Sequence, residues 1–256
     1  MGAQESLLGK HVLITGGGTG IGAAIARALS KEGAKLSLAG RRKGPLDAMA
    51  AELPRTLAVV ADITKHADCT KMAAAANAAH GPIDIVIANA GAASSAPVGQ
   101  IDLKAWQAAI DVNLTGAFLT VGAVLPDVTR APGGRIVFIA STAGLKGYPY
   151  VAAYVAAKHG VVGLMKAMSL ELAGKGVTVN AVCPGYTDTP LVDAAAAKIS
   201  AKTGRSDGDS RAVLAKDNAH GRLIAPEEVA STVLWLCSPE AASINGQAIA
   251  VTGGPL

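Results

Sequence analysis

Short apolar runs alternate with longer alanine-rich stretches along most of this sequence. The apolar runs lack the strict apolar–polar alternation of half-exposed strands, which is typical of strands buried on both faces of a sheet. The alanine-rich stretches are typical of helices that cover such a sheet. Seven strands are predicted, over residues 11–15, 35–40, 56–62, 83–91, 134–141, 177–185 and 247–254. Helices are predicted over residues 21–33, 45–53, 66–80, about 102–126 and about 151–173.

This alternation of strand and helix predicts an α/β fold: a doubly wound (Rossmann) parallel seven-stranded sheet with helices on both faces. The chain of 256 residues contains no linker-like stretch, so residues 1–256 are expected to form a single domain. Ligands of such folds bind outside the carboxyl ends of the strands, which is where chemistry is expected.

Residues 190–222 interrupt the alternation, because they carry many charged residues and no predicted strand. The basic and acidic side chains of this insertion are Lys198, Lys202, Arg205, Arg211, Lys216, Arg222, Asp193, Asp207, Asp209 and Asp217. An insertion after the sixth strand would overhang the ligand crevice, so we predict a mobile substrate lid. An ordinary pair of solvent-exposed helices is the alternative.

Composition narrows the class of protein further. Half of the residues are hydrophobic but only 3% are aromatic, so the core must be built from aliphatic side chains. The net charge of +4 is spread without a block of like charges, and aromatic side chains are few, which argues against a nucleic-acid-binding surface. The five histidines show no metal-binding spacing, so no metal is expected.

Three features bear on cellular location. Cys69, Cys183 and Cys237 are scattered and odd in number, which favours buried thiols in a reducing compartment over disulfides. The first ten residues lack the apolar core of a signal peptide, and no uninterrupted apolar run of about 18 residues occurs. We therefore predict a cytoplasmic protein without a membrane span.

A glycine-rich stretch, TGGGTGIG at residues 15–22, joins the first predicted strand to the first predicted helix. Glycines at such a junction let the backbone approach a pyrophosphate, and the helix N-terminus offers free N–H groups to that anion. The succession of strand, glycine loop and helix therefore predicts a dinucleotide site. The contacts expected within the loop are Gly16, Thr19, Gly20, Ile21 and Gly22.

The second predicted strand ends in AGRRK, where Arg41 and Arg42 follow Gly40. Many dinucleotide folds place a carboxylate there to bind the ribose hydroxyls, and this stretch has none. Guanidinium groups pair well with phosphate, so the sequence favours NADP(H), whose ribose carries a 2′-phosphate, over NAD(H). The alternative is that the arginines cover the adenine or face solvent.

The stretch GYPYVAAYVAAKHG, residues 147–160, holds three of the four tyrosines. Tyr154 and Lys158 are four residues apart on a predicted helix, which places them one turn apart on one face. An ammonium stabilises a nearby phenolate, so we expect Lys158 to lower the pKa of Tyr154, whose phenol would exchange a proton with a carbinol or carbonyl oxygen. Tyr148 and Tyr150 lack such a cation and flank a proline, so we expect them in a loop or pocket wall.

Two further polar side chains are expected near the crevice. Ser141 follows the fifth predicted strand among small neighbours, which leaves its hydroxyl accessible. Asn113 is an amide inside an otherwise apolar predicted helix, where a buried amide needs partners. It is expected to bend the helix or to hold a water.

Together these residues make the chain resemble the short-chain dehydrogenase/reductase family over about residues 10–254. The motifs that carry the resemblance are TGGGTGIG, Asp62 in VADIT, the NAG at 89–91, Asn113, Ser141, the Y-x-x-x-K at 154–158 and CPGYTDTP at 183–190. The resemblance implies a catalytic tetrad made of Asn113, Ser141, Tyr154 and Lys158.

The resemblance also implies a role for each residue. Tyr154 would be the general acid/base, and Ser141 would hold the substrate oxygen. Lys158 would bind the nicotinamide ribose and lower the pKa of Tyr154, and Asn113 would anchor a water that relays protons from Lys158. The implied cofactor contacts beyond the glycine loop and arginines are Asp62, Ile63, Asn89, Ala90, Gly91, Tyr154, Lys158, Pro184, Gly185, Thr187 and Thr189. The candidate substrate contacts are Tyr148, Tyr150 and Tyr186.

Two positions depart from the family's pattern. The usual pair of asparagines before Ala-Gly is here Ala88-Asn89, so one amide that supports the sheet is missing, and we expect little loss of catalysis. Thr187 replaces the apolar residue usual after Pro-Gly-aromatic. That cofactor contact runs through the backbone, so binding is expected to survive.

The resemblance implies an enzyme that transfers hydride between NADP(H) and a ketone or secondary alcohol. The first choice of substrate is a 3-oxoacyl or 3-hydroxyacyl thioester of CoA or acyl carrier protein, since the basic insertion would meet its phosphates. An NAD-dependent dehydrogenase of an alicyclic or aryl secondary alcohol is the alternative, and a non-catalytic dinucleotide-binding redox sensor is the alternative from another class. The resemblance also implies a homotetramer, with the helices near 102–126 and 151–173 at an interface.

Overall fold

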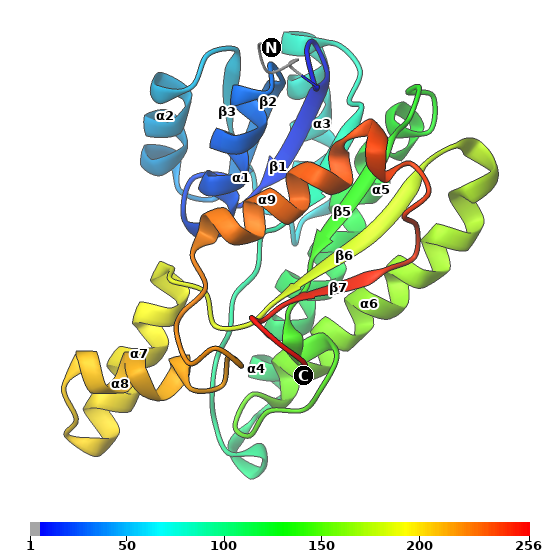
Figure 1. Ribbon diagram of the computed structural model, residues 1–256. Coiled ribbons are helices and arrows are strands. Elements are labelled where there is room, and N and C mark those ends of the chain that lie inside the picture. The colour runs from blue at the N-terminus through cyan, green and yellow to red at the C-terminus, as the bar shows by residue number, and fades with distance from the viewer. Residues whose placement is uncertain (1–5) are drawn as a thin grey trace.

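Seven parallel strands form one sheet in the computed structural model of the protein, which describes residues 6–256 (Figure 1). The strands lie in the order β3-β2-β1-β4-β5-β6-β7. Their bounds are β1 (His11–Thr15), β2 (Lys35–Gly40), β3 (Thr56–Val60), β4 (Ile85–Ala88), β5 (Arg135–Ile139), β6 (Thr178–Pro184) and β7 (Ala248–Val251). This confirms the predicted doubly wound fold. The NAG at 89–91 follows β4, however, and is not part of it.

The sheet is buried on both faces because successive strand residues pack into two different cores. In β1, Leu13 joins one buried cluster, whereas Val12 and Ile14 join the other. The helices that supply the two cores are α1 (Gly20–Lys31), α2 (Lys43–Glu52) and α9 (Pro226–Cys237) on one face, and α3 (His66–His80), α5 (Gly116–Val128) and α6 (Ala152–Leu172) on the other. Apolar side chains on both faces of the strands explain why the sequence shows no period-two pattern.

The order of the strands reverses between β1 and β4. From β1 the chain builds outward to β2 and β3, and from β4 it builds in the opposite direction to β7. The loops that leave β1 and β4 therefore diverge at the carboxyl edge of the sheet and open a crevice there.

The helical stretch Leu103–Val128 changes its winding in the middle. It consists of α4 (Leu103–Ile110), a π-helix over Asp111–Thr115, and α5. By length and composition it also qualifies as a helix that crosses a membrane, although polar residues interrupt its apolar run. It packs against β4, β5, α3 and α6, so we assign it to the helix layer of the sheet.

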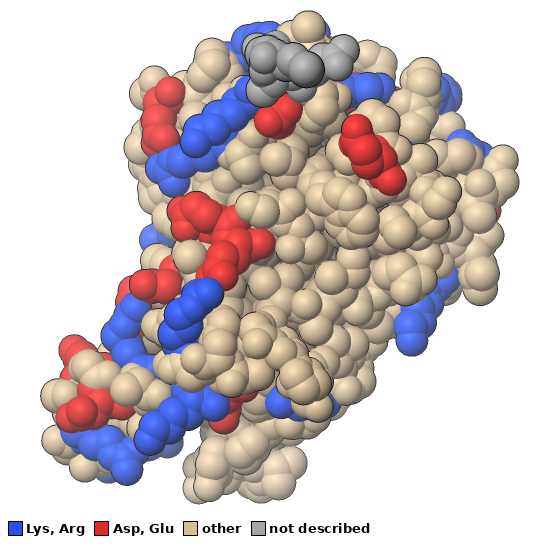
Figure 2. Space-filling view, in the orientation of Figure 1, with Lys and Arg blue, Asp and Glu red and all other residues tan. Residues whose placement is uncertain are grey.

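The insertion at 190–222 forms two helices, α7 (Pro190–Thr203) and α8 (Asp207–Ala215), which project from the sheet at the lower left of Figure 1. Val192, Ala196 and Leu214 pack between them. Figure 2 shows charged side chains of both signs on this projection, whereas the face over β6 and β7 carries few. The insertion is thus a pair of helices, which is compatible both with a substrate lid and with an ordinary solvent-exposed helix pair. That the pair is mobile stays a prediction.

Helix α9 was not predicted from the sequence, although its start is marked. Pro226 stands in the first turn, and the Glu228 carboxylate accepts a hydrogen bond from the backbone N–H of Ala225 at 2.7 Å. Val229, Val233 and Leu236 are buried at helical spacing. A proline and acidic residues before an apolar repeat are the usual marks of a helix start.

The three cysteines are free and buried, as predicted. The expectation about a signal peptide falls partly on residues 1–5, which lie outside the described residues.

Candidate active site

One cavity of about 1150 Å³ lies at the carboxyl edge of the sheet. It brings together every site residue that the sequence predicts. These are Gly16, Thr19, Gly20, Ile21, Gly22, Arg41, Arg42, Asp62, Ile63, Asn89, Ala90, Gly91, Asn113, Ser141, Tyr148, Tyr150, Tyr154, Lys158, Pro184, Gly185, Tyr186, Thr187 and Thr189. Their chemical roles stay predictions.

The glycine loop leaves room for an anion because side chains are excluded from it. Gly16 adopts a positive φ of 67°, and a Cβ on Gly22 would stand 2.2 Å from the Gly16 carbonyl oxygen. At the start of α1, the side chain of Thr19 caps no backbone group, and no acidic residue lies in the first turn. The free N–H groups and partial positive charge of this terminus therefore fit a pyrophosphate.

Hydrogen bonds between β1 and the end of β4 hold the loop in place. Asn89 Nδ2 donates to the backbone oxygens of Thr15 (2.8 Å) and Gly16 (3.3 Å). The Thr15 hydroxyl in turn accepts from the backbone N–H groups of Asn89 (3.1 Å) and Ala90 (3.2 Å). Asn89 is the one asparagine left of the family's usual pair, and it links β1 to the end of β4. Ala88, which replaces the other asparagine, is buried.

Two arginines stand where the second strand ends. Arg41 and Arg42 are exposed and line the cavity, and Arg42 donates to the Thr19 hydroxyl at 3.2 Å. Within residues 6–256 neither forms an ion pair with a carboxylate. Asp62 is nearby, but its Oδ1 accepts from the Thr64 backbone and hydroxyl, and these bonds lower its pKa. Both guanidinium groups are therefore available to a ligand anion.

Tyr154, Lys158 and Ser141 meet deeper in the cavity. The Lys158 ammonium donates to the Ile139 carbonyl oxygen at 2.8 Å and lies 5.7 Å from the centre of the Tyr154 ring. Ser141 Oγ accepts from the Ala143 N–H at 3.1 Å, which leaves its own hydrogen free to donate. Helix α6 supplies the phenol and the ammonium, and the turn after β5 supplies the hydroxyl.

The predicted lowering of the Tyr154 pKa is wrong for this arrangement. Burial raises the pKa of Tyr154, and the nearby Ser141 hydroxyl, which can donate its hydrogen to the phenol oxygen, opposes only part of that effect. Burial also lowers the pKa of Lys158 from 10.5 to about 8. The sequence showed the spacing of the two groups but not how dry their surroundings are, and removal from water disfavours both charged forms.

Asn113 occupies the π-helix and bonds to the loop that follows β4. Its Nδ2 donates to the carbonyl oxygens of Ala92 (2.8 Å) and Ala109 (2.9 Å), and its Oδ1 accepts from the Ala92 N–H (3.2 Å). Both amide hydrogens are therefore used. The helix has π-helical winding at Asn113, and the side chain positions the loop. The bend, the bound water and the proton relay stay predictions.

Gly91 marks the closest approach between these parts. A Cβ there would lie 2.7 Å from Asn113 Oδ1 and 3.5 Å from Lys158 Nζ. No side chain fits without moving Asn113, whose three hydrogen bonds fix it. The glycine of the NAG motif is thus required by packing.

Tyrosines line the next part of the wall. The Tyr148 hydroxyl donates to Thr142 Oγ1 at 2.8 Å, and its ring meets that of Tyr186 edge to face, with centroids 6.3 Å apart. Tyr150 is 64% exposed at a φ of 66°, which is unusual for a residue other than glycine. All three stand in the wall as predicted; contact with substrate stays a prediction.

The loop 92–97, which follows β4, is a part of the cavity wall that was not found from the sequence. The insertion was expected to overhang the crevice, and the inner side of α7 and α8 does line the cavity, although the sequence did not show which of its residues would do so. Its lining residues are Leu191, Val192, Ala194, Ala195, Lys198, Ile199, Lys202, Thr203, Val213, Leu214 and Asp217.

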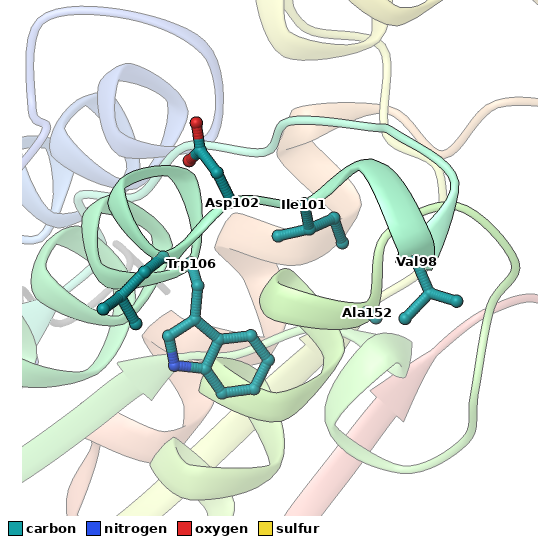
Figure 3. Close-up of a pocket in the computed structure, with 6 residues that line it drawn as sticks. Val98, Ile101, Asp102, Trp106 and Ala152 are labelled. Atoms are coloured by element: carbon teal, nitrogen blue, oxygen red, sulfur yellow. The ribbon is translucent and has the colours of Figure 1, made fainter.

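A second, smaller pocket of about 330 Å³ lies between α4 and the start of α6 (Figure 3). Val98, Ile101, Trp106 and Ala152 line it with apolar surface. Asp102 is the only ionisable residue on its wall, and its carboxylate caps α4 by accepting from the Ala105 N–H at 2.7 Å. This pocket therefore offers no group for acid–base chemistry.

No cluster of His, Cys, Asp or Glu suited to a metal ion occurs within residues 6–256. That the site works without a metal ion stays a prediction.

Comparisons with known proteins agree with this geometry. A family model described as short chain dehydrogenase matches residues 10–200. The chain is 37% identical to a D-beta-hydroxybutyrate dehydrogenase of Rhizobium meliloti, covering 96% of this chain and 98% of that protein. It is 36% identical to a putative ketoacyl reductase of Streptomyces coelicolor (99% and 98% covered) and 35% identical to a cis-4-hydroxycyclohexanecarboxylate dehydrogenase of Sinomonas cyclohexanicum (98% and 98%). A crystal structure of a variant of actinorhodin polyketide ketoreductase with NADPH superimposes with a TM-score of 0.91 at 35% identity, covering 99% of this chain and 98% of that one.

The buried ammonium predicts a pH-dependent cost to folding. The unfolded chain keeps Lys158 protonated up to its ordinary pKa of 10.5, whereas the folded chain releases the proton at about 8. Between these values the unfolded chain binds more protons, so the stability of the wild type rises with pH. The variant Lys158→Met lacks this ammonium and therefore lacks its pH-dependent contribution to stability. We expect the stability of the variant relative to wild type to fall by about 2 kcal/mol between roughly pH 7 and roughly pH 9.5.

Urea unfolding of both proteins at the two pH values measures this change. Lys175→Met, in the exposed turn after α6, is the control and should show the same difference from wild type at both. A constant difference for Lys158→Met as well would show that the ammonium is not costly to bury.

Proposed function

This chain belongs to the short-chain dehydrogenase/reductase family, and on that basis we propose that it reduces 3-oxoacyl thioesters with NADPH. Its relatives are ketoacyl reductases and secondary-alcohol dehydrogenases, so the chain is an oxidoreductase that acts on ketones and secondary alcohols with NAD(P). One observation carries the finer proposal: a single cavity joins the glycine loop and arginines to Tyr154, Ser141 and Lys158. A catalytic member of this family uses Tyr154, Ser141 and Lys158 in its reaction, whereas a non-catalytic redox sensor would not need them.

The chemistry follows from the state of the Tyr154 phenol. The bound nicotinamide supplies the hydride that adds to the carbonyl carbon. Because burial raises the pKa of Tyr154, the phenol holds its proton at neutral pH and serves as the acid that donates it to the carbonyl oxygen. Ser141 has a free hydroxyl hydrogen with which to hold that oxygen beside Tyr154. Lys158, fixed by the Ile139 carbonyl, would bind the ribose of the cofactor beside this pair.

The preference for a thioester is supported by the relative named a ketoacyl reductase and by the extent of the cavity. Beyond the tyrosines the cavity continues along α7, with room for an extended arm. An alicyclic secondary alcohol is the second candidate, favoured by the relative named for a hydroxycyclohexanecarboxylate. Trial turnover of acetoacetyl-CoA against cyclohexanone separates the two.

Tyr154→Phe removes the acid and leaves the ring in place. We expect kcat for acetoacetyl-CoA reduction to fall by about 100-fold or more, while the affinity for NADPH stays within about twofold, because the phenol serves the transition state. Steady-state kinetics and fluorescence titration of NADPH measure the two quantities. Turnover near the wild-type rate would remove Tyr154 from the mechanism; loss of both quantities together would indicate misfolding.

The preference for NADPH is proposed from the arginines. In Arg41→Ala with Arg42→Ala we expect KM for NADPH to rise by about tenfold or more and KM for NADH to change little, because only NADPH carries the phosphate that they bind. Arg130→Ala, an exposed arginine after α5, is the matched control and should change neither. A wild-type enzyme that prefers NADH would contradict the proposal before any variant is made.

We infer that the chain assembles as a homotetramer through α5 and α6. Both helices leave large apolar side chains exposed, with Phe118 at 55% and Leu170 at 83%. Light scattering should give about four times the chain mass of 25.4 kDa, and Phe118→Glu should give a smaller species, because a charge in an apolar interface is costly. Leu8→Glu, at a site 64% exposed outside these helices, should leave the assembly intact. A monomeric wild type would refute the assembly.

A further inference from the structure

The far wall of the cavity carries two lysines one helical turn apart. Lys198 and Lys202 stand at positions i and i+4 of α7, and both line the cavity that contains Tyr154. Within residues 6–256 neither forms an ion pair or a side-chain hydrogen bond, and both side chains are exposed. Two ammonium groups on one helix face, without a protein partner, are available to an anion.

The other basic residues of the insertion are not available in this way. Arg211 pairs with Asp193 of α7 and with Asp188 of the loop between β6 and α7, so these ion pairs link α8 to both. Arg222 pairs with Glu228 at the start of α9. Arg205 and Lys216 do not line the cavity. Among the described residues, the positive charge of the insertion therefore faces the cavity only through Lys198 and Lys202.

The wall around these lysines is apolar, with one exception. Leu191, Val192, Ala195 and Ile199 line it between the tyrosines and the lysines, and Asp217 is its single carboxylate. Two cations against one anion leave this end of the cavity positive. A ligand that suits it has an uncharged reacting end, an apolar or neutral middle and a negative group at the distal end.

We propose that Lys198 and Lys202 form an anion subsite that binds a negative group on the distal end of the substrate. The inference rests on the proposed function, since it concerns the substrate of the same cavity. The shared chemistry is an anionic oxygen group, either a phosphate at the end of a long thioester arm or the carboxylate of a short oxo acid. Because the ammonium groups stand on α7 rather than at the tyrosines, they set affinity for the substrate and not the rate of the chemical step.

The test compares one reacting ketone with and without the negative group. The substrates are acetoacetyl-CoA, the neutral N-acetylcysteamine thioester of acetoacetate, and free acetoacetate, each with NADPH. In Lys198→Gln with Lys202→Gln we expect KM for acetoacetyl-CoA to rise by about tenfold with kcat nearly unchanged, because each lost charge pair weakens binding by a few-fold. Constants for the neutral thioester should stay within about twofold.

Lys216→Gln is the control, since it removes one positive charge from the same insertion at a position outside the cavity. It should leave the kinetics of all three substrates as in wild type. Added salt should raise KM for acetoacetyl-CoA in wild type and do so less in the double variant, because ions screen exposed charges.

The outcomes distinguish a phosphate from a carboxylate as the bound group, and they distinguish failure of the anion subsite from failure of the proposed function. A loss confined to acetoacetyl-CoA assigns the subsite to a phosphate arm, and a loss confined to acetoacetate assigns it to a short carboxylate. An equal loss on the neutral thioester, no loss on either anion, or a wild type that turns over only the neutral ketone overturns the inference. Turnover of the neutral thioester by wild type supports the proposed function in every one of these cases, whereas a wild type that reduces no ketone refutes that function itself.

Discussion

The active site depends on one close approach, at Gly91. The hydrogen of this glycine is all that fits between the loop after β4, the Asn113 amide and the Lys158 ammonium. The amide is fixed to the same loop by two hydrogen bonds with Ala92 and to α4 by a third with the Ala109 carbonyl, and the ammonium is fixed to the carbonyl end of β5. Three segments far apart in the sequence are thereby held in one arrangement, and the position of Tyr154 one turn before Lys158 follows from it.

Burial of these polar groups costs desolvation free energy. Hydrogen bonds to backbone groups, rather than ion pairs, offset this cost. The polar side chains at its centre are partnered by carbonyl oxygens and N–H groups of the strands and their loops, as at Ile139 and Ala92. These partners belong to β5 and to the loop after β4. A neutral phenol and a weakly basic ammonium are the result. Preorganised dipoles of this kind are what a hydride-transfer site requires.

The sequence predicted the fold and the placement of the chemistry because both depend on local patterns. Glycines between a strand and a helix, and a phenol four residues before a lysine, each have a meaning that neighbours along the chain decide. The direction of the Tyr154 pKa depends instead on how much water the whole fold excludes, and it was predicted with the wrong sign. Helix α9 was missed although Pro226 and Glu228 mark its start locally. The residues of α7 that line the cavity could not be picked out within the insertion. Nothing local distinguishes Lys198 and Lys202, which line the cavity, from Lys216, which does not; only the packing of α7 against α8 does.

The π-helix at Asp111–Thr115 has a consequence for the length of the chain. A π-turn holds one residue more than an α-turn, so it rotates everything after it by about 100° relative to everything before it. The extra residue therefore sets which side of α5 faces the sheet. That side carries the buried residues Val121, Val124 and Val128. Removal of a single residue from this stretch would restore a regular helix and turn those valines away from the core. Within this family the stretch is therefore expected to vary in sequence but not in number of residues, since the geometry that presents Asn113 is also the geometry that sets the register of the helix behind it.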